Sequence, residues 1–348
     1  MQQNEWDYPP PPGVEPVSGP HTWRWIILTL VTGVLLVVAL VVPIPVFYEF
    51  IPGPIDDVEA LVHIDGASTY SSEGELYLTT VRVKTEVTFY ELVSAAIDSE
   101  KSIVLREDFT GGLTTEEVQH QQEIEMTESK TNAQIVALGE LGLADPEGEG
   151  ARVESIVPGS PAEGALRAGD VIVEIDDSTV PTACDVTAIL GRYRSGDDVS
   201  ITVRRGSSLD TVRATLTESP DGSSVFLGVA LTDVGYEFNP DLDITIETGE
   251  IGGPSAGLMF ALAVYDRLTP GDLTGGRSIA GTGTIGCDGS VGPIGGVGLK
   301  VIAAERAGAE VFLAPDGDFD EARDAAGEIE VLSISDFDEA LSGLEGLD

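Results

Sequence analysis

The stretch Gly-Pro-Ser-Ala-Gly at residues 253–257 is followed downstream by Gly-Gly-Val-Gly-Leu-Lys at residues 295–300. A serine framed by small residues becomes a nucleophile only when a neighbouring group accepts its proton. Histidine, the usual acceptor, is excluded because no histidine lies beyond residue 120. Lysine is equally scarce, and only Lys300 lies beyond residue 130. The sequence therefore indicates a candidate Ser-Lys dyad formed by Ser255 and Lys300.

Two other interpretations compete in this region. Ser255 could instead cap a helix over residues 256–268, where its hydroxyl would accept a hydrogen bond from a backbone N–H. The run Gly-Thr-Gly-Thr-Ile-Gly at residues 281–286 matches the dinucleotide-binding pattern G-x-G-x-x-G. That pattern is rejected because the glycine-rich residues 287–296 cannot form the helix that such a site needs. The sequence also contains no G-x-x-x-x-G-K-[ST] motif for binding ATP.

The composition excludes some classes of function. The chain has 348 residues, with 60 acidic and 18 basic side chains and a formal net charge of −42. Such a surface repels phosphate backbones, which excludes nucleic acid as a partner. A hydrophobic content of 42% argues against a disordered acidic protein. Cys184 and Cys287 are too few for a disulfide framework and have no metal-ligand spacing, so we expect two unpaired thiols.

The first 48 residues divide into two segments. Residues 1–24 are rich in proline and lack apolar periodicity, which predicts a disordered cytoplasmic tail. Residues 25–48 are nearly all apolar up to Val42, carry no charge, and could cross a bilayer core of about 30 Å. This predicts a retained transmembrane anchor rather than a cleaved signal peptide, and the single Arg24 before it places the following residues outside the membrane. Aromatic residues at its two ends are expected to lie in the membrane interface: Trp23, Trp25, Phe47 and Tyr48.

Residues 141–220 carry a second set of motifs. Val-Pro-Gly-Ser-Pro-Ala at residues 157–162 and Leu-Arg-Ala-Gly-Asp-Val-Ile at residues 166–172 resemble a bacterial PDZ domain of the kind attached to extracytoplasmic proteases. The resemblance implies binding of an extended peptide by strand addition. The loop that would cradle a peptide carboxylate maps to Leu141, Gly142 and Leu143.

The acidic residues 144–147 follow this loop directly and would disfavour a bound carboxylate. A PDZ domain that only spaces or caps the catalytic part is therefore the alternative to one that binds peptides.

Further motifs surround the dyad. They are Gly-Gly-Pro-Ser-Ala-Gly-Leu at 252–258, Leu-Thr-Pro-Gly-Asp-Leu-Thr-Gly-Gly at 268–276, Ala-Gly-Thr-Gly-Thr-Ile at 280–285, Val-Gly-Pro-Ile-Gly-Gly at 291–296, Lys300, and Ala-Gly-Ala-Glu-Val-Phe-Leu-Ala-Pro at 307–315. Together they resemble the proteolytic domain of Lon-type peptidases. Combined with the PDZ motifs, they resemble the membrane-anchored, PDZ-containing Lon-like proteases of Gram-positive bacteria.

The resemblance extends to the segment before the PDZ motifs. Residues 74–81 look like the first strand of the Lon fold and residues 126–133 like its first helix, and a capping pattern at Thr114 predicts that this helix starts there. Residues 56–140 would then join residues 222–348 in one catalytic unit. The predicted fold class is α+β, with one N-terminal transmembrane helix and a Lon-type α/β domain. A PDZ domain is either inserted into the Lon-type domain or lies next to it.

In the mechanism that the resemblance implies, Ser255 attacks the scissile carbonyl and neutral Lys300 accepts its proton. Burial among apolar neighbours would lower the lysine pKa from about 10.4. Thr282 matches the family threonine beside the dyad and is expected to orient the lysine, while backbone N–H groups near Ser255 would stabilise the oxyanion. One departure is Gly252, which stands where many Lon domains have an acidic residue, with Glu250 two positions earlier.

The sequence thus predicts an ATP-independent, membrane-anchored serine endopeptidase with its catalytic part outside the membrane. Polypeptide substrates and the membrane are the expected partners, no cofactor or metal is expected, and the resemblance further implies an oligomer. The alternatives are a catalytically inactive PDZ scaffold that binds peptides and a PDZ chaperone that regulates another protease. An inactive homologue would be expected to lack Ser255 or Lys300, and this chain keeps both.

Overall fold

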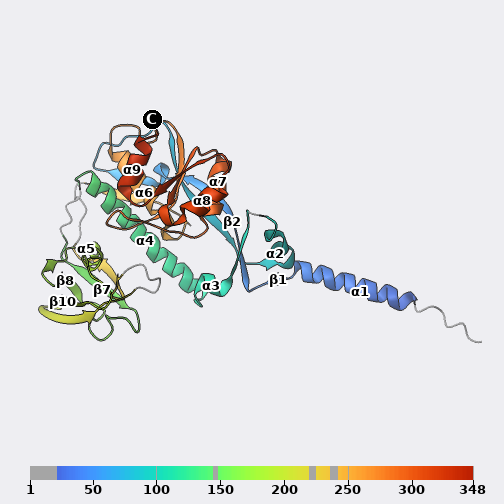
Figure 1. The fold of residues 1–348 in the computed structure, drawn as a ribbon, viewed down its shortest axis with the longest axis horizontal. Helices are drawn as coiled ribbons and strands as arrows, with labels where there is room; N and C mark the ends of the chain where they lie inside the picture. The colour runs from blue at the N-terminus through green and yellow to red at the C-terminus, as the bar shows by residue number, and fades with distance from the viewer. Residues whose placement is uncertain are drawn as a thin grey trace, which may run out of the picture.

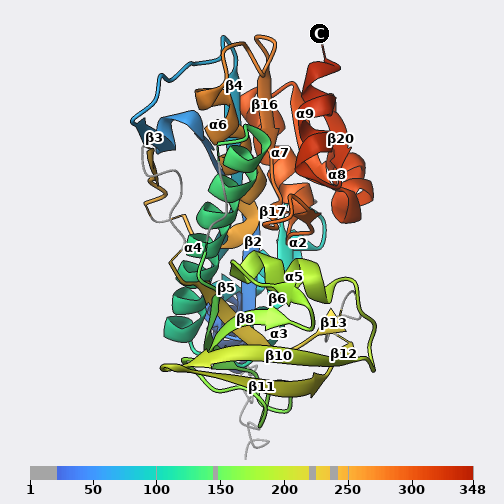
Figure 2. The ribbon, with the colours of Figure 1, turned by 90° about the vertical axis from the view of Figure 1, so that its left-hand side faces the viewer.

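The computed structural model describes residues 22–98, 100–143, 148–218, 225–235, 242–249 and 251–347. These residues form an N-terminal helix, a large domain and a small domain (Figures 1 and 2). The large domain comprises the described residues of 43–143 and 242–347, and the small domain comprises those of 148–235. The predicted disordered tail falls almost entirely on residues 1–21, which lie outside the described residues.

Helix α1 (Thr22–Val41) projects away from the large domain (Figure 1). In the part of the chain that the structure describes, no helix combines the length and the apolar character needed to cross a membrane. The residues predicted as one anchor belong to several elements, because β1 (Pro43–Ile44) and β2 (Phe47–Asp57) follow the helix. Tyr48, predicted to lie in a membrane interface, is buried in the protein instead, and its ring meets that of Phe109 edge-on.

A six-stranded mixed sheet forms the centre of the large domain, in the order β20-β19-β16-β4-β2-β6. Strands β4 (Glu75–Lys84), β16 (Ser278–Gly281), β19 (Val311–Pro315) and β20 (Glu330–Ile334) are parallel. β2 runs antiparallel between β4 and β6 (Ser102–Leu105). Strands that precede and follow the small domain in sequence are therefore neighbours in one sheet, which makes the small domain an insertion.

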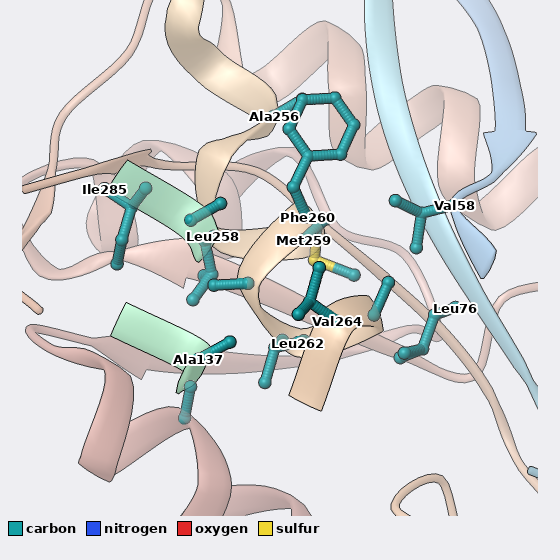
Figure 3. Packing of buried hydrophobic residues seen from close by; sticks show 14 of the residues in the cluster. Val58, Leu76, Ala137, Ala256, Leu258, Met259, Phe260, Leu262, Val264 and Ile285 are labelled. Atoms are coloured by element: carbon teal, nitrogen blue, oxygen red, sulfur yellow. The ribbon is translucent and has the colours of Figure 1, made fainter. Parts of the chain in front are cut away.

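Side chains alternate between the two faces of this sheet and build an apolar layer on each. One layer packs under α4 (Thr115–Glu140), α6 (Gly257–Leu268) and α9 (Phe337–Glu345), and it contains Leu76 and Leu78 of β4 (Figure 3). The opposite layer packs under α7 (Val297–Ala307) and α8 (Phe319–Ala325), and it contains Tyr77 of the same strand. Residues 257–264 of α6 are all buried, which explains why they carry no charge.

Helix α4 begins where the capping pattern predicts. The Thr114 hydroxyl accepts a hydrogen bond from the Glu117 N–H, and the Glu117 carboxylate accepts one from the Thr114 N–H. The carboxylate also accepts a hydrogen bond from the Thr114 hydroxyl, and the two bonds that it accepts from Thr114, first the one from the N–H, lower the pKa of Glu117 because they favour its charged form. The cap sets the start of a 26-residue helix whose buried positions include Ser129 and Ala133.

The small domain has its own sheet, in the order β11-β10-β8-β7-β14, and its own apolar core. Its elements are β7 (Ala151–Ile156), β8 (Val171–Ile175), β9 (Ser178–Thr179), α5 (Ala183–Leu190), β10 (Asp198–Arg205), β11 (Ser208–Thr215) and β14 (Val229–Asp233). An ion pair between the buried Asp170 and the half-buried Arg205 fixes the turn before β8, where the Asp170 carboxylate accepts hydrogen bonds of 2.7 and 2.6 Å from the Arg205 guanidinium. These bonds hold the pKa of Asp170 below its usual range.

The remaining elements are short. Four antiparallel pairs are formed by β1 with β5 (Val87–Thr88), β3 (Val62–Asp65) with β15 (Asp243–Ile246), β12 (Thr217–Glu218) with β13 (Val225–Phe226), and β17 (Thr284–Ile285) with β18 (Val291–Gly292). The short helices are α2 (Phe89–Ala95), α3 (Arg106–Thr110), η1 (Glu59–Leu61), η2 (Pro254–Ala256) and η3 (Asp316–Asp318). The β3–β15 pair again joins segments from both sides of the insertion.

A disulfide joins Cys184 of α5 to Cys287 in the turn between β17 and β18, with the two Cα atoms 5.6 Å apart. The prediction of two unpaired thiols is therefore wrong. The 103 residues that separate them in sequence conceal their proximity, because the insertion brings α5 against the β17–β18 turn.

A substitution at Gly257 tests the close packing of α6 against α4 and β17. A Cβ at this position would lie 2.7 Å from both the Ile285 Cγ2 and the Ser129 Oγ, so Gly257→Ala should force α6 away from α4 and β17. We expect a loss of about 1–3 kcal/mol in unfolding free energy, measured by chemical denaturation. The matched control is Gly139→Ala on the exposed face of α4, where a Cβ meets nothing within 4 Å and alanine favours the helix. Equal stability of the two variants would contradict this packing.

Candidate active site

Ser255 lies in η2, immediately before α6, and Lys300 lies in α7 on the other face of the sheet. The structure brings the two residues together, with the Lys300 Nζ 2.7 Å from the Ser255 Oγ. Gly253 makes the turn into η2 with a φ of 86°, a conformation that a residue with a Cβ rarely adopts. The alternative role of Ser255 as a helix cap is not observed, because Ala256 occupies the cap of α6 and makes no side-chain hydrogen bond.

Thr282 completes a cycle of hydrogen bonds around the dyad. Its hydroxyl lies 2.8 Å from the Lys300 Nζ and donates to the Ser255 carbonyl oxygen at 2.9 Å. Since the threonine proton is used on that carbonyl, Oγ1 is free only to accept, and one Nζ hydrogen must point at it. In the neutral amine, the Nζ lone pair is then available to the Ser255 hydroxyl. This geometry is compatible with the orienting role expected for Thr282, which stays a prediction.

The Lys300 amine is held in an apolar environment. Its side chain is 1% exposed and belongs to a helix whose neighbouring residues Val297 and Val301 are fully buried. Burial lowers the pKa of Lys300 to about 7, because an ammonium ion loses its hydration there, and the Asp318 carboxylate opposes this shift. At neutral pH a large fraction of Lys300 is therefore an unprotonated base.

Three polar side chains that the sequence did not single out hold the backbone around the dyad. The Thr79 hydroxyl of β4 donates to the Gly281 carbonyl at 3.0 Å, just before Thr282. On α4, the Ser129 hydroxyl donates to the Pro254 carbonyl at 3.1 Å and the Asn132 side chain donates to the Ile285 carbonyl at 3.0 Å. Polar residues spaced three apart on the face of α4 that also carries Met126 and Ala133 were the available signal.

A cavity of about 690 Å³ adjoins the segment that leads into Ser255. Its walls come from β2, α3, α4, the end of β4 and the backbone around Ile251 and Gly252. Apolar side chains line much of it, including Tyr48, Phe109 and Met126. The cavity reaches Gly252, three residues before Ser255, and Ser255 itself does not line it. Within the described ranges, no group of three or more histidine, cysteine or acidic side chains is placed to hold a metal ion.

The predicted carboxylate loop, Leu141 to Leu143, lies at the end of α4 and outside the strands of the small domain. The acidic residues 144–147 and Glu250 lie outside the described residues. An outer edge of the small sheet is formed by β14, which pairs with β7 on one side. Helix α5 begins beside the end of β14, where the Asp233 carboxylate accepts a hydrogen bond of 2.6 Å from the Ala183 N–H.

Two family profiles match the chain. A PDZ domain matches residues 122–216, and the Lon protease (S16) C-terminal proteolytic domain matches residues 215–343. The chain is therefore a mixed α+β protein that carries a PDZ domain and a Lon-type proteolytic domain, and the latter implies a serine peptidase. The structure places β13 and β14 with the small domain, which we call the PDZ domain from here on.

The curated relatives are distant. The Lon protease of Roseiflexus castenholzii is 36% identical over 107 residues, which cover 29% of this chain and 13% of that protein. The Lon protease of Clostridioides difficile is 38% identical over 117 residues, covering 31% and 15%. The chain thus spans only a small part of the length of these relatives. Among solved structures, the PDZ domain of an SdrC-like protein from Listeria monocytogenes is similar at 27% identity, covering 24% of this chain and 87% of that one with a TM-score of 0.23.

Thr282→Val tests the orienting contact. Valine keeps the shape of threonine but removes the acceptor of the Lys300 hydrogen bond, so the amine loses its fixed direction. We expect kcat for peptide cleavage to fall about 10- to 100-fold with KM little changed, as the loss of a buried hydrogen bond predicts. Thr282→Ser, which keeps the hydroxyl, should retain most of the activity. Equal kcat for the valine and serine variants would show that the contact does not orient the base.

The pH dependence of cleavage tests the state of Lys300. Below pH 7 the amine is protonated and cannot accept the serine proton, so kcat/KM should rise about tenfold per pH unit at low pH and level off above a midpoint of about 7. Asp318→Asn removes the carboxylate that raises the lysine pKa, and it should move the midpoint to lower pH. A rate that is flat between pH 5 and 9, or a midpoint that rises in Asp318→Asn, would contradict this assignment.

Proposed function

We propose that this protein is an ATP-independent serine endopeptidase that cleaves polypeptides through the dyad of Ser255 and Lys300. The observation that carries the proposal is the buried Lys300 amine, which lies 2.7 Å from the Ser255 hydroxyl and is oriented by Thr282. Lysine with a pKa of about 7 has the basicity that a general base needs at neutral pH. The absence of an ATP-binding motif from the sequence supports a reaction that needs no nucleotide.

The reaction follows from this arrangement. Ser255 Oγ attacks the scissile carbonyl carbon as its proton passes to Lys300 Nζ, and the tetrahedral intermediate collapses when the leaving amine takes that proton. Water then attacks the acyl-enzyme ester as Nζ accepts a proton from it. The bond between the acyl carbon and Ser255 Oγ breaks, the carboxylic acid product leaves, and Nζ returns the proton to Oγ. Backbone N–H groups beside Ser255 would stabilise the developing oxyanion, where the dipole of α6 adds to their effect.

Substrate selection by the PDZ domain is a further part of the proposal. The outer edge of β14 offers backbone groups to which an extended peptide can add as another strand, beside α5. We propose this edge as the place where the peptide adds as a strand. The segment Leu141 to Leu143, expected to cradle the peptide carboxylate, follows α4 and lies outside the strands of the sheet, and its role stays a prediction.

Membrane attachment through residues 25–48 and a catalytic part outside the membrane stay proposals. The uncharged composition of residues 25–48 supports attachment. The Cys184–Cys287 disulfide supports an oxidising compartment, where such bonds form and persist. An oligomer stays an expectation that rests on the family resemblance alone.

Ser255→Ala and Lys300→Met test the dyad. The full chain, in mild detergent, would be incubated with a labelled unfolded protein and with a short fluorogenic peptide at several salt concentrations. Because both residues act in one step, we expect each variant to lose at least about a thousandfold in kcat/KM. Cleavage by both variants at the wild-type rate would end the dyad hypothesis. Peptide binding without any cleavage by the wild type would favour the inactive scaffold, and holdase activity that survives Ser255→Ala would favour the chaperone.

Lys300→Met also shows whether an inactive variant is folded. The lysine pKa falls from 10.5 to about 7 on folding, so between these values the unfolded chain holds a proton that the native chain does not. Burying Lys300 therefore costs stability, most at and below pH 7 and progressively less as the pH rises toward 10.5. We expect Lys300→Met to have a higher Tm than the wild type at pH 6, with a difference that shrinks by pH 10.

A further inference from the structure

The two domains share little besides the disulfide. Each has its own apolar core, formed by Val153, Ile172 and Ile201 in the PDZ domain and by residues such as Leu76 and Phe260 in the large domain. Across the described residues, every hydrogen bond and ion pair of the PDZ domain is made within that domain. The disulfide between Cys184 and Cys287 is a covalent bond that crosses from one domain to the other.

Both ends of the disulfide lie next to functional segments. Cys184 is in the first turn of α5. The first N–H of this helix donates to the Asp233 carboxylate at the end of β14, and this hydrogen bond attaches α5 to the proposed peptide edge. Cys287 follows β17, which continues from Thr282. In the same segment, the Gly283 N–H donates to the Ser255 carbonyl at 2.8 Å. The disulfide and one hydrogen bond on each side of it, from Ala183 to Asp233 and from Gly283 to Ser255, therefore link the peptide edge to the segment that holds the nucleophile.

The disulfide is open to a reductant. Both cysteines are half-buried, and Cys287 lines a cavity of about 420 Å³ between the end of α4 and the start of α9. Carboxylates surround this cavity, from Glu140, Asp288, Asp336 and Asp338. An uncharged dithiol can approach through such a cavity, whereas an anionic thiol is repelled.

We propose that the Cys184–Cys287 disulfide is a redox-sensitive tether that holds the β14 edge in register with Ser255, and so favours polypeptides long enough to occupy both sites at once. This inference rests on the proposed function. A dithiol reductant breaks the S–S bond by giving two electrons and two protons, which leaves two cysteine thiols and converts the reductant to its own disulfide. The PDZ domain then stays attached only by the chain on either side of it, and the effective concentration of a bound polypeptide at Ser255 falls.

The test compares two substrates before and after reduction. The full chain would be assayed with a labelled unfolded protein and with a fluorogenic hexapeptide too short to reach both sites. Dithiothreitol should lower kcat/KM for the unfolded protein about tenfold and leave the hexapeptide rate unchanged. Cys184→Ser and Cys287→Ser should behave like the reduced wild type and should not respond to dithiothreitol, which makes them the matched controls for any other effect of the reductant.

Three outcomes would overturn the tether. They are equal losses on both substrates, an unchanged rate on the unfolded protein, and free thiols at both cysteines in mass spectra of the unreduced chain. Failure of the proposed function gives a different result, namely no cleavage of the hexapeptide by the oxidised wild type. In that case small-angle scattering still tests the tether, which predicts a larger radius of gyration for the reduced chain and is refuted by an unchanged one.

Discussion

The large domain is shaped by one constraint. The Lys300 amine must be kept out of water and yet have its lone pair directed at Ser255, because a hydrated lysine would be protonated and inert as a base. The amine comes from α7 on one face of the sheet and the serine precedes α6 on the other, so the pair can meet only at the end of the sheet. β16 supplies that end, and Thr282 follows it directly. The geometry of the dyad thus depends on the packing of both apolar layers.

Much of this arrangement is predictable from the sequence. Ser255 and Lys300 emerge because no histidine and only one lysine lie beyond residue 130, and this scarcity is a property of composition. The start of α4 is predictable because the reciprocal bonds of Thr114 and Glu117 are local. The burial that lowers the pKa of Lys300 is foreseeable from the aliphatic residues around it in α7.

Other features depend on contacts between distant segments and leave no local signal. Thr79 and Ser129 are ordinary polar residues in the sequence, and only the fold shows that they hold the backbone on both sides of the dyad. The pairing of Cys184 with Cys287 could not be read from their spacing. Tyr48 follows an uncharged stretch and resembles the end of a membrane anchor, although β2 carries it into the sheet beside Phe109.

The insertion of the PDZ domain also determines the order in which the chain matures during synthesis. β4 pairs with β16, which lies about 200 residues later in the sequence. The sheet of the large domain therefore cannot be completed until the ribosome has passed residue 281. The PDZ domain, with its separate core, can fold before that point. Ser255 emerges from the ribosome before Lys300, and the base is buried only after the strands that surround it have paired. If the proposed function holds, a nascent chain carries a finished PDZ domain and a nucleophile that still lacks its base, which would protect neighbouring chains from premature cleavage.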